Sequence, residues 1–248
     1  MTVAVPGLVR PRDVDEAVAV LADGAARPVA GATALLVDVA RGAGAPSRLV
    51  DLTTLDELTA LDPAAGSGLG SRRVGAAVSL ARLVRSGGAL GTAAAQIASH
   101  PVRLRATVGG NIVAPGWPHD LRTVLWALGA TLEVAGPAAR RRVAVSLDPR
   151  TLAPQEVLVA LHVPSTPATV VAGGGVTAGR PALQVVVSRS TGRAAVGTSG
   201  WRRPLPATGT AAAAGTDIGA VLGDELVGLG VPRLVAHDLA DRSARPAA

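Results

Sequence analysis

The sequence predicts an α+β fold in three successive parts, and three observations support this prediction. Residues 1–60 have the order strand–loop–helix–strand of a small βαβ unit. Residues 61–164 mix short helices with several strands, which predicts a mixed β-sheet with helices. A Pro-, Thr- and Gly-rich segment, residues 164–180, then marks a boundary before a small α+β C-terminal part, residues 165–248.

The first helix is indicated by a capping motif. Asp13-Val-Asp-Glu16 places a capping side chain three residues before an acid, and Gly24 ends the helix. Four apolar residues share one helical face: Val14, Ala17, Val18 and Leu21.

A βαβ unit follows this helix. We expect a short buried strand at 27–30, a turn at 31–33, a second helix at 34–41 capped by Thr33, and a strand at 47–51. The turn lies at the carboxyl end of its strand. Open α/β sheets place anionic ligands there, against a helix N-terminus.

The remaining elements follow from apolar patterning and turn residues. In the second part, strands are expected at 69–77, 131–134, 142–145 and 157–163. Helices are expected at 79–84, capped by Ser79, and at 91–99 and 120–128. In the third part we expect a strand pair at 183–187 and 194–197, then helices at 207–214 and 218–229.

The single asparagine of the chain, Asn111, closes the run Arg105-Ala-Thr-Val-Gly-Gly-Asn111 and is the best functional clue. Two consecutive glycines let the backbone approach a ligand closely and offer free N–H donors. Asn adds both a donor and an acceptor on a short side chain. A tight turn with a chance asparagine is the alternative interpretation, because Gly-Asn is a common turn pair.

Composition excludes several classes of site. The absence of cysteine excludes disulfides, thiolate metal sites and any iron–sulfur cluster carried by this chain itself. The four histidines, His100, His119, His162 and His237, lack metal-ligand spacing. No apolar run approaches 18 residues and no signal peptide is evident, so we expect no membrane span and a cytoplasmic protein.

The net charge of +6 does not indicate a nucleic-acid partner. All basic residues other than histidine are arginines, and they are spread over the chain as pairs and triplets instead of forming one stripe. Only three aromatic side chains are present to stack on bases: Trp117, Trp126 and Trp201.

Four segments together resemble the FAD-binding (medium) subunit of molybdenum hydroxylases. That family includes the medium subunit of aerobic carbon monoxide dehydrogenase and the flavin domain of xanthine dehydrogenase. The segments are Val29-Ala-Gly-Ala-Thr-Ala-Leu-Leu36, Leu49-Val-Asp-Leu-Thr53, Val74-Gly-Ala-Ala-Val-Ser79 and Ile97-Ala-Ser-His-Pro-Val-Arg-Leu-Arg-Ala-Thr-Val-Gly-Gly-Asn-Ile112. The resemblance continues through Asp120, 128–134 and 152–158 and, more faintly, 180–184 and 196–204, so it covers nearly the whole chain.

The resemblance implies a two-subdomain FAD-binding fold followed by a C-terminal flavoprotein domain. It also implies that two loops hold the FAD pyrophosphate through backbone N–H groups, without a cationic side chain. The implied cofactor-binding residues are Pro28, Val29, Ala30, Gly31, Ala32, Thr33, Ala34, Leu35, Thr107, Val108, Gly109, Gly110 and Asn111 in those loops, with Ile97, Asp120 and Leu158 elsewhere. For Asp120 alone, a plain helix cap is the alternative.

The sequence departs from the family pattern at several positions. Ala32 stands where the family usually has a second glycine, and its methyl group points to weaker phosphate binding. Ile97 stands where an aromatic residue is common. A lysine found near the flavin in some members has no counterpart, and the segment 169–178 stands there instead. His119 precedes Asp120 where small residues are common, and a surface histidine is the simpler interpretation.

No catalytic side-chain constellation is evident, so the chemistry is expected to be that of the cofactor. The resemblance implies an oxidoreductase subunit that passes electrons from a small iron–sulfur subunit, via FAD, to an external acceptor such as NAD, quinone or oxygen. A large molybdenum-cofactor subunit would hydroxylate the substrate, in a heterotrimer that forms a dimer of heterotrimers. The alternative is a non-catalytic scaffold subunit of the same fold with weakened or lost FAD binding.

Overall fold

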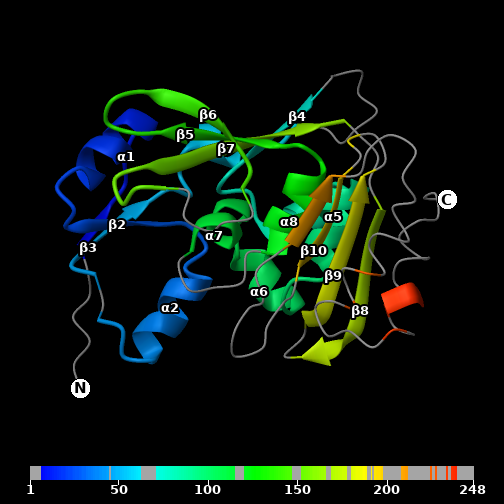
Figure 1. Ribbon diagram of the computed structural model, residues 1–248. Helices are drawn as coiled ribbons and strands as arrows, with labels where there is room; N and C mark the ends of the chain where they lie inside the picture. Colours follow the sequence, from blue (N-terminus) through cyan, green and yellow to red (C-terminus); the bar gives the residue numbers. More distant parts are fainter. Residues whose placement is uncertain are drawn as a thin grey trace.

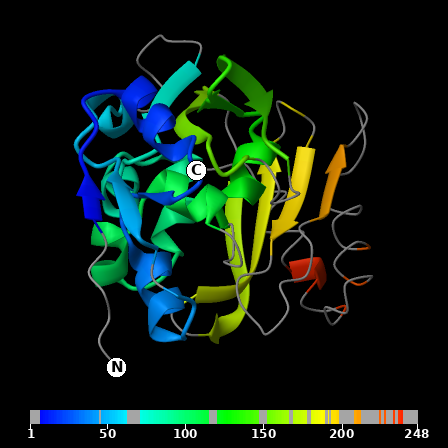
Figure 2. The ribbon, with the colours of Figure 1, turned by 90° about the vertical axis from the view of Figure 1, so that its left-hand side faces the viewer.

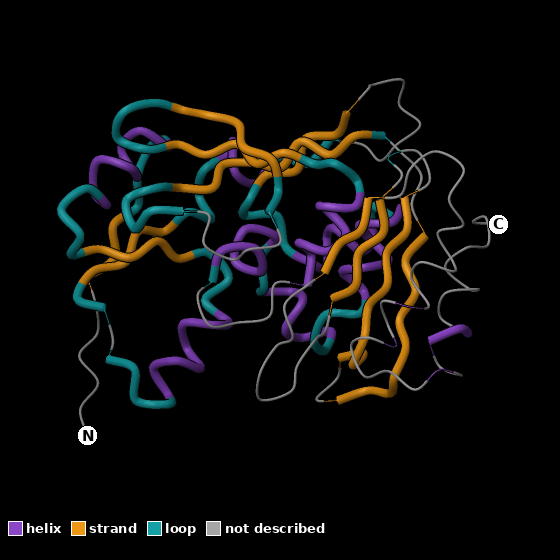
Figure 3. The backbone as a smooth tube through the Cα atoms, in the orientation of Figure 1, coloured by secondary structure: helices purple, strands orange, loops and turns teal. Residues whose placement is uncertain are grey.

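Three β-sheets organise the residues that the computed structural model describes (Figures 1 and 2). The structure describes residues 7–44, 46–62, 71–114, 120–146, 152–165, 169–177, 180–188, 191, 193–197 and 208–211, together with 224, 227, 233 and 236–238. Most helices lie between the second and third sheets, and the first sheet lies at the opposite side of the molecule from the third (Figure 3).

The first sheet confirms the βαβ unit. It is parallel, with the order β1-β3-β2, where β1 is Gly7–Val9, β2 is Ala26–Val29 and β3 is Arg48–Asp51. Helix α1 (Val14–Leu21) precedes β2, and helix α2 (Thr33–Ala40) connects β2 to β3.

The capping motif of α1 is confirmed. Asp13 caps the helix, and its Oδ1 accepts a hydrogen bond from the Glu16 backbone N–H at 2.8 Å. The four residues of the expected apolar face are all buried: Val14, Ala17, Val18 and Leu21. The sequence therefore positions this helix on the first sheet through its apolar side.

The expected cap of α2 was wrong by one residue. Ala32 is the N-cap, and Thr33 is the first residue of the helix, with no side-chain cap hydrogen bond. Ala32 has φ +59°, a left-handed backbone conformation that turns the chain from β2 directly into α2. The backbone at Ala32 therefore makes the turn expected at 31–33, and no threonine side chain caps the helix.

The second sheet contains all four strands expected in the middle part of the chain. It is antiparallel, with the order β4-β7-β5-β6. The strands are β4 (Ser71–Gly75), β5 (Thr131–Ala135), β6 (Arg140–Ala144) and β7 (Val157–Pro164).

Six helices accompany this sheet in the described part of the chain: α3 (Asp56–Thr59), α4 (Leu80–Arg85), α5 (Gly88–Ala95), α6 (His100–Arg105), α7 (Val108–Val113) and α8 (Asp120–Ala127). The Ser79 cap of α4 is confirmed, since its side chain accepts from the Arg82 N–H at 3.2 Å. Helix α5 begins and ends earlier than the expected 91–99, with Gly87 as its N-cap and Gln96 as its C-cap.

The Gly-Gly-Asn segment is helical, so its interpretation as a loop was wrong. Gly109, Gly110 and Asn111 lie in the first turns of α7. Thr107 caps this helix by accepting a hydrogen bond from the Gly110 N–H at 3.2 Å. A threonine cap offsets the low helix propensity of two glycines because it satisfies an otherwise unpaired donor.

The third sheet is antiparallel, with the order β11-β10-β9-β8. Strands β9 (Arg180–Ser188) and β10 (Arg193–Gly197) confirm the expected strand pair. The segment expected to be a Pro-, Thr- and Gly-rich connection instead contains strand β8 (Thr169–Thr177). Its β-branched residues and its pairing with β9 outweigh its glycines.

The helix expected at 207–214 was wrong, because strand β11 (Thr208–Ala211) lies there and pairs with β10. The alanine-rich sequence favours a helix, but tertiary pairing overrides that local preference. The helix expected at 218–229 lies outside the described residues except for Asp224 and Val227, which are helical. The two domain boundaries, at residues 60 and 164, remain predictions.

Two hydrophobic clusters join the three sheets. The larger one packs α4, α5, α7 and α8 against the second sheet and reaches Val186 and Ala195 of the third. The smaller one joins α1 and β3 to Val157 and Val159 of β7. No helix among the described residues is long and apolar enough to cross a membrane.

Candidate functional site

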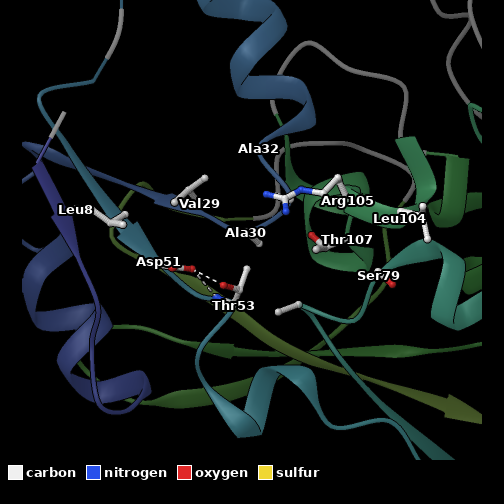
Figure 4. Close-up of a pocket in the computed structure, with 12 residues that line it drawn as sticks. Leu8, Val29, Ala30, Ala32, Asp51, Thr53, Ser79, Leu104, Arg105 and Thr107 are labelled. Carbon is white, nitrogen blue, oxygen red and sulfur yellow. Dashed lines mark hydrogen bonds between the residues drawn. The ribbon is translucent and has the colours of Figure 1, made fainter. Parts of the chain in front are cut away.

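A cavity of about 370 Å³ opens between the first sheet and the segment that joins α6 to α7 (Figure 4). Its volume lies near the lower end of the ~300–1,000 Å³ that small-molecule sites occupy. It is lined by Leu8, Val29, Ala30, Gly31, Ala32, Asp51, Thr53, Ala77, Ser79, Leu104, Arg105 and Thr107. The β2–α2 turn, residues 30–32, thus faces a cavity at the carboxyl end of β2, as the βαβ order predicts.

Gly31 allows the two sides of the cavity to touch. A Cβ atom on Gly31 would lie 2.1 Å from the carbonyl oxygen of Arg105 and 3.0 Å from the Cα of Ala106. No side chain fits at that separation, so the glycine is needed for close backbone packing. The β2–α2 turn and the α6–α7 connection are therefore held together as one unit.

The start of α2 has backbone donors suited to an anion. The Leu36 N–H bonds to the Ala32 carbonyl at 2.9 Å and closes the first helical turn. The N–H groups of Thr33, Ala34 and Leu35 precede that bond and have no acceptor within the helix. A left-handed residue followed by helical residues turns successive N–H groups toward one concave site. The helix dipole further favours negative charge there.

Two charged side chains line the cavity. Asp51 is constrained, because its Oδ1 accepts from the Thr53 backbone N–H at 2.9 Å and from the Thr53 hydroxyl at 2.6 Å (Figure 4). Its Oδ2 lies 3.8 Å from Nε of Arg10. Arg105 is exposed and extends from the end of α6 toward the Ala30–Ala32 turn (Figure 4).

The Gly-Gly-Asn residues have structural contacts. Gly109 donates to the Ala76 carbonyl at 2.7 Å, and a Cβ there would lie 2.9 Å from the same oxygen. The Asn111 Oδ1 accepts from the Leu121 N–H at 3.0 Å, near the start of α8. The close approach that we attributed to a ligand is thus, at Gly109, an approach to the chain itself.

The cavity brings together five of the residues expected to bind the cofactor: Val29, Ala30, Gly31, Ala32 and Thr107. Eight others lie in the same two segments without lining it: Pro28, Thr33, Ala34, Leu35, Val108, Gly109, Gly110 and Asn111. Ile97 and Leu158 lie in the core, with 3% and 4% of their surface exposed, and the structure does not bring them to the cavity. His119 and the side chain of Asp120 lie outside the described residues.

Sequence reasoning missed Leu8, Asp51, Thr53, Ala77, Ser79, Leu104 and Arg105. A carboxylate roughly 20 residues after the glycine turn of a βαβ unit is a known ribose-binding signal and could have found Asp51. Leu8 belongs to a three-residue strand that shows no periodic pattern. Arg105 reaches the cavity through the contact of its segment with Gly31, which the sequence does not reveal.

Comparison with known protein families shows which family this chain belongs to. Residues 4–166 match the family model described as the FAD binding domain in molybdopterin dehydrogenase. The chain belongs to this family. The predicted resemblance is confirmed, as are an oxidoreductase assignment and FAD as the cofactor.

Solved structures share the fold over nearly the whole chain. Quinoline 2-oxidoreductase from Pseudomonas putida 86 is 20% identical, with 98% of both chains covered and a TM-score of 0.76. The Cu,Mo-CO dehydrogenase is 23% identical, with 98% of this chain and 99% of that chain covered and a TM-score of 0.74. The carbon monoxide dehydrogenase from Hydrogenophaga pseudoflava is 22% identical, with 98% and 96% covered and a TM-score of 0.72.

Proposed function

We propose that this chain is the electron-transfer subunit of a molybdenum hydroxylase and binds FAD in the cavity at the start of α2. The observation that carries the proposal is the position of this cavity in a chain of the FAD-binding family. The N-terminus of α2, with its free backbone donors, adjoins the cavity, and an arginine lines it. This combination suits the diphosphate of a dinucleotide. The residues present therefore fit the cofactor.

The chain's own contribution is to bind and orient FAD. The Gly31–Ala32 turn and the first N–H groups of α2 would hold the diphosphate, and Thr107 would face it from the other side of the cavity. The other expected contacts, including Ile97, Asp120 and Leu158, remain part of the proposal. When bound, FAD would supply the redox chemistry of accepting and donating electrons.

The proposal includes two partner subunits. This chain has no cysteine, so iron–sulfur clusters that feed its flavin would have to be carried by another chain. The similar solved structures are a quinoline oxidoreductase and carbon monoxide dehydrogenases, one of them described as a Cu,Mo enzyme. We therefore propose a small iron–sulfur subunit and a large molybdenum-cofactor subunit, in a heterotrimer that pairs into a dimer of heterotrimers.

Ala32 favours one alternative function. Ala32 carries a methyl group and lines the cavity with φ +59°. It lies at the turn that we propose approaches the phosphates of FAD. A scaffold subunit that retains the fold but has weakened FAD binding would tolerate such a residue. The two functions differ in a single property of the purified full-length chain, its affinity for FAD.

Flavin retention by matched glycine variants tests the proposal. The wild-type chain should purify with flavin absorbance or acquire it when FAD is added. Gly31→Ala should lose FAD, because its Cβ would push apart the two backbone segments that form the cavity. Gly44→Ala is the control, since no atom lies within 4 Å of its added Cβ and it should bind FAD like wild type. Thermal unfolding of each variant separates loss of FAD from loss of the fold.

A wild-type chain that stays colourless after FAD is added would overturn the proposal and favour the scaffold function. A flavin-loaded Gly31→Ala variant would instead show that FAD binds elsewhere on the chain. Size-exclusion chromatography with mass detection tests the partners. The chain should form a stable complex with the two co-expressed subunits, and a flavin-loaded monomer that ignores both would contradict the subunit assignment.

A further inference from the structure

We propose that Arg105 supplies a side-chain cation that pairs with the diphosphate of the bound cofactor. This inference rests on the proposed function, and it assigns a role to a residue outside the expected binding loops. It also departs from the implied family pattern, in which backbone N–H groups hold the pyrophosphate without a cationic side chain. Three features of Arg105 carry it: a fixed backbone, a guanidinium with no partner among the residues that the structure describes, and an anion site opposite.

The backbone of Arg105 is fixed beside the cavity. Its carbonyl packs against Gly31, where a Cβ would lie only 2.1 Å away. The next residue, Ala106, donates to the Val102 carbonyl at 2.7 Å and accepts from the Leu80 N–H at 2.8 Å. The side chain of Arg105 therefore starts from a rigid point, so less conformational entropy is lost when it binds a ligand.

The guanidinium of Arg105 is available for a ligand. Within the described part of the chain, no hydrogen bond or ion pair to its side chain is found, and it extends toward the Ala30–Ala32 turn (Figure 4). Arg103, two residues earlier, has partners within the chain instead, since its Nη1 donates to the Ile97 carbonyl at 2.9 Å and to the Ala98 carbonyl at 2.5 Å. The cavity carboxylate, Asp51, is held by Thr53 instead.

The opposite side of the cavity supplies backbone donors for the same diphosphate. The left-handed turn at Ala32 and the N-terminus of the eight-residue helix α2 favour an anion in front of them. The planar fork of an arginine pairs with phosphate oxygens through two parallel hydrogen bonds. A diphosphate placed at this turn would therefore have backbone donors on one side and the Arg105 guanidinium on the other.

Substitutions of Arg105 that remove its charge or only its planar fork test its role. FAD affinity is measured by titration for wild type, Arg105→Gln, Arg105→Met and Arg105→Lys. We expect Gln and Met to weaken FAD binding by about 10- to 100-fold, with Lys in between, because a point charge retains attraction without the planar fork. Arg85→Gln is the control, since Arg85 is an exposed helix-end arginine outside the cavity and its loss should change nothing.

Two further readouts locate the effect at the phosphates. The wild-type affinity should fall as salt rises, and the fall should be shallower in Arg105→Gln because one ionic contact is missing. ADP, which carries the diphosphate, should bind the variant more weakly than wild type, by about the same factor as FAD, whereas the dissociation constant of adenosine should be equal in both proteins.

The outcomes separate this inference from the proposed function. A wild-type chain that does not bind FAD would overturn the proposed function itself. If wild type binds FAD and the Gln and Met variants bind within twofold of it, with an unchanged salt dependence, Arg105 is not a phosphate ligand and the FAD-binding function stands.

Discussion

Ala32 has a strained backbone conformation and lines the cavity proposed to bind FAD. Its φ of +59° is a conformation that costs an L-residue with a Cβ about 1–2 kcal/mol relative to a right-handed one. The strained residue lies in the turn that faces the cavity and begins α2. Strain of this kind persists where the surrounding structure holds the backbone in place, as the contact of Gly31 with Arg105 does here.

Ala32→Gly should stabilise the fold and tighten FAD binding. Glycine removes the strain of about 1–2 kcal/mol, but its greater freedom in the unfolded chain costs about 0.5–1 kcal/mol. The net gain therefore lies between about 0 and about 1.5 kcal/mol. FAD affinity should rise because the cavity loses a methyl group. Urea unfolding measures the first effect and FAD titration the second.

Ala98→Gly is the matched control for this pair of effects. Ala98 is the other non-glycine residue with a positive φ in the described chain, at +50°, and it does not line the cavity. Its replacement should stabilise the fold similarly and leave FAD affinity unchanged. A less stable Ala32→Gly protein would show that the turn does not strain alanine.

At the scale of elements, Asn111 connects two helices. It lies in α7, and its Oδ1 accepts a hydrogen bond from the Leu121 N–H at 3.0 Å, so it caps the start of α8. Arg122 reinforces the junction from within α8, with Nε donating to the Ile112 carbonyl at 2.9 Å. Asn111 therefore fixes helices α7 and α8 relative to each other.

Asn111→Ala should destabilise the fold by about 1 kcal/mol, because the first turn of α8 loses its acceptor. Asn111→Asp should keep most of the stability, since a carboxylate accepts the same hydrogen bond and suits a helix N-terminus. Chemical unfolding of the two variants beside wild type measures both. Equal losses in the two variants would mean that the bond to Leu121 contributes little to stability.

Elements with a strong local signal could be predicted from the sequence. The α1 helix has both a cap and a periodic face, β5 alternates apolar and polar residues, and β7 has an apolar run. Strand β1 and helix α3 are too short to show a period. Strand β11 was missed because the alanine run at 211–214, which begins at its last residue, favours a helix, and only pairing with β10 makes it a strand.

The site could be predicted in part for the same physical reason. The Gly31–Ala32 turn was found because strand, turn and helix are consecutive in sequence. Arg105 and Leu8 join the cavity from other segments, through contacts that no local pattern shows. The two glycines at 109 and 110 were overinterpreted, since backbone packing against Ala76 requires the first of them as strictly as a ligand would.

At the scale of the whole molecule, a charged network joins the first and second parts of the chain. Glu133 on β5 contacts His162 on β7, with 2.7 Å between Oε2 and Nε2. Its Oε2 lies 3.7 Å from Nε of Arg73 on β4, and its Oε1 lies 3.8 Å from Nη1 of Arg140 on β6. Arg140 also pairs with Glu57 of α3 at 2.5 Å. One carboxylate therefore links all four strands of the second sheet.

The network makes stability depend on pH on the acid side. Burial alone would raise the pKa of Glu133, but the hydrogen bond from His162 and the charges of Arg73, His162 and Arg140 outweigh it, so the pKa lies below its ordinary value of 4.5. A carboxyl group whose pKa is lower in the folded state stabilises the fold above its unfolded pKa. That stabilisation is lost as the pH falls through the folded pKa.

Glu133→Gln should therefore be less stable than wild type at pH 7, and the difference should shrink as the pH falls below about 4.5, where wild type loses the same charge. Urea unfolding of both proteins from pH 7 to pH 3 measures this convergence. Asp56→Asn is the control, because Asp56 is exposed and outside the network, and its difference from wild type should vary less over this range. A Glu133→Gln deficit that stays constant down to pH 3 would show that packing at this position, and not its charge, joins the strands.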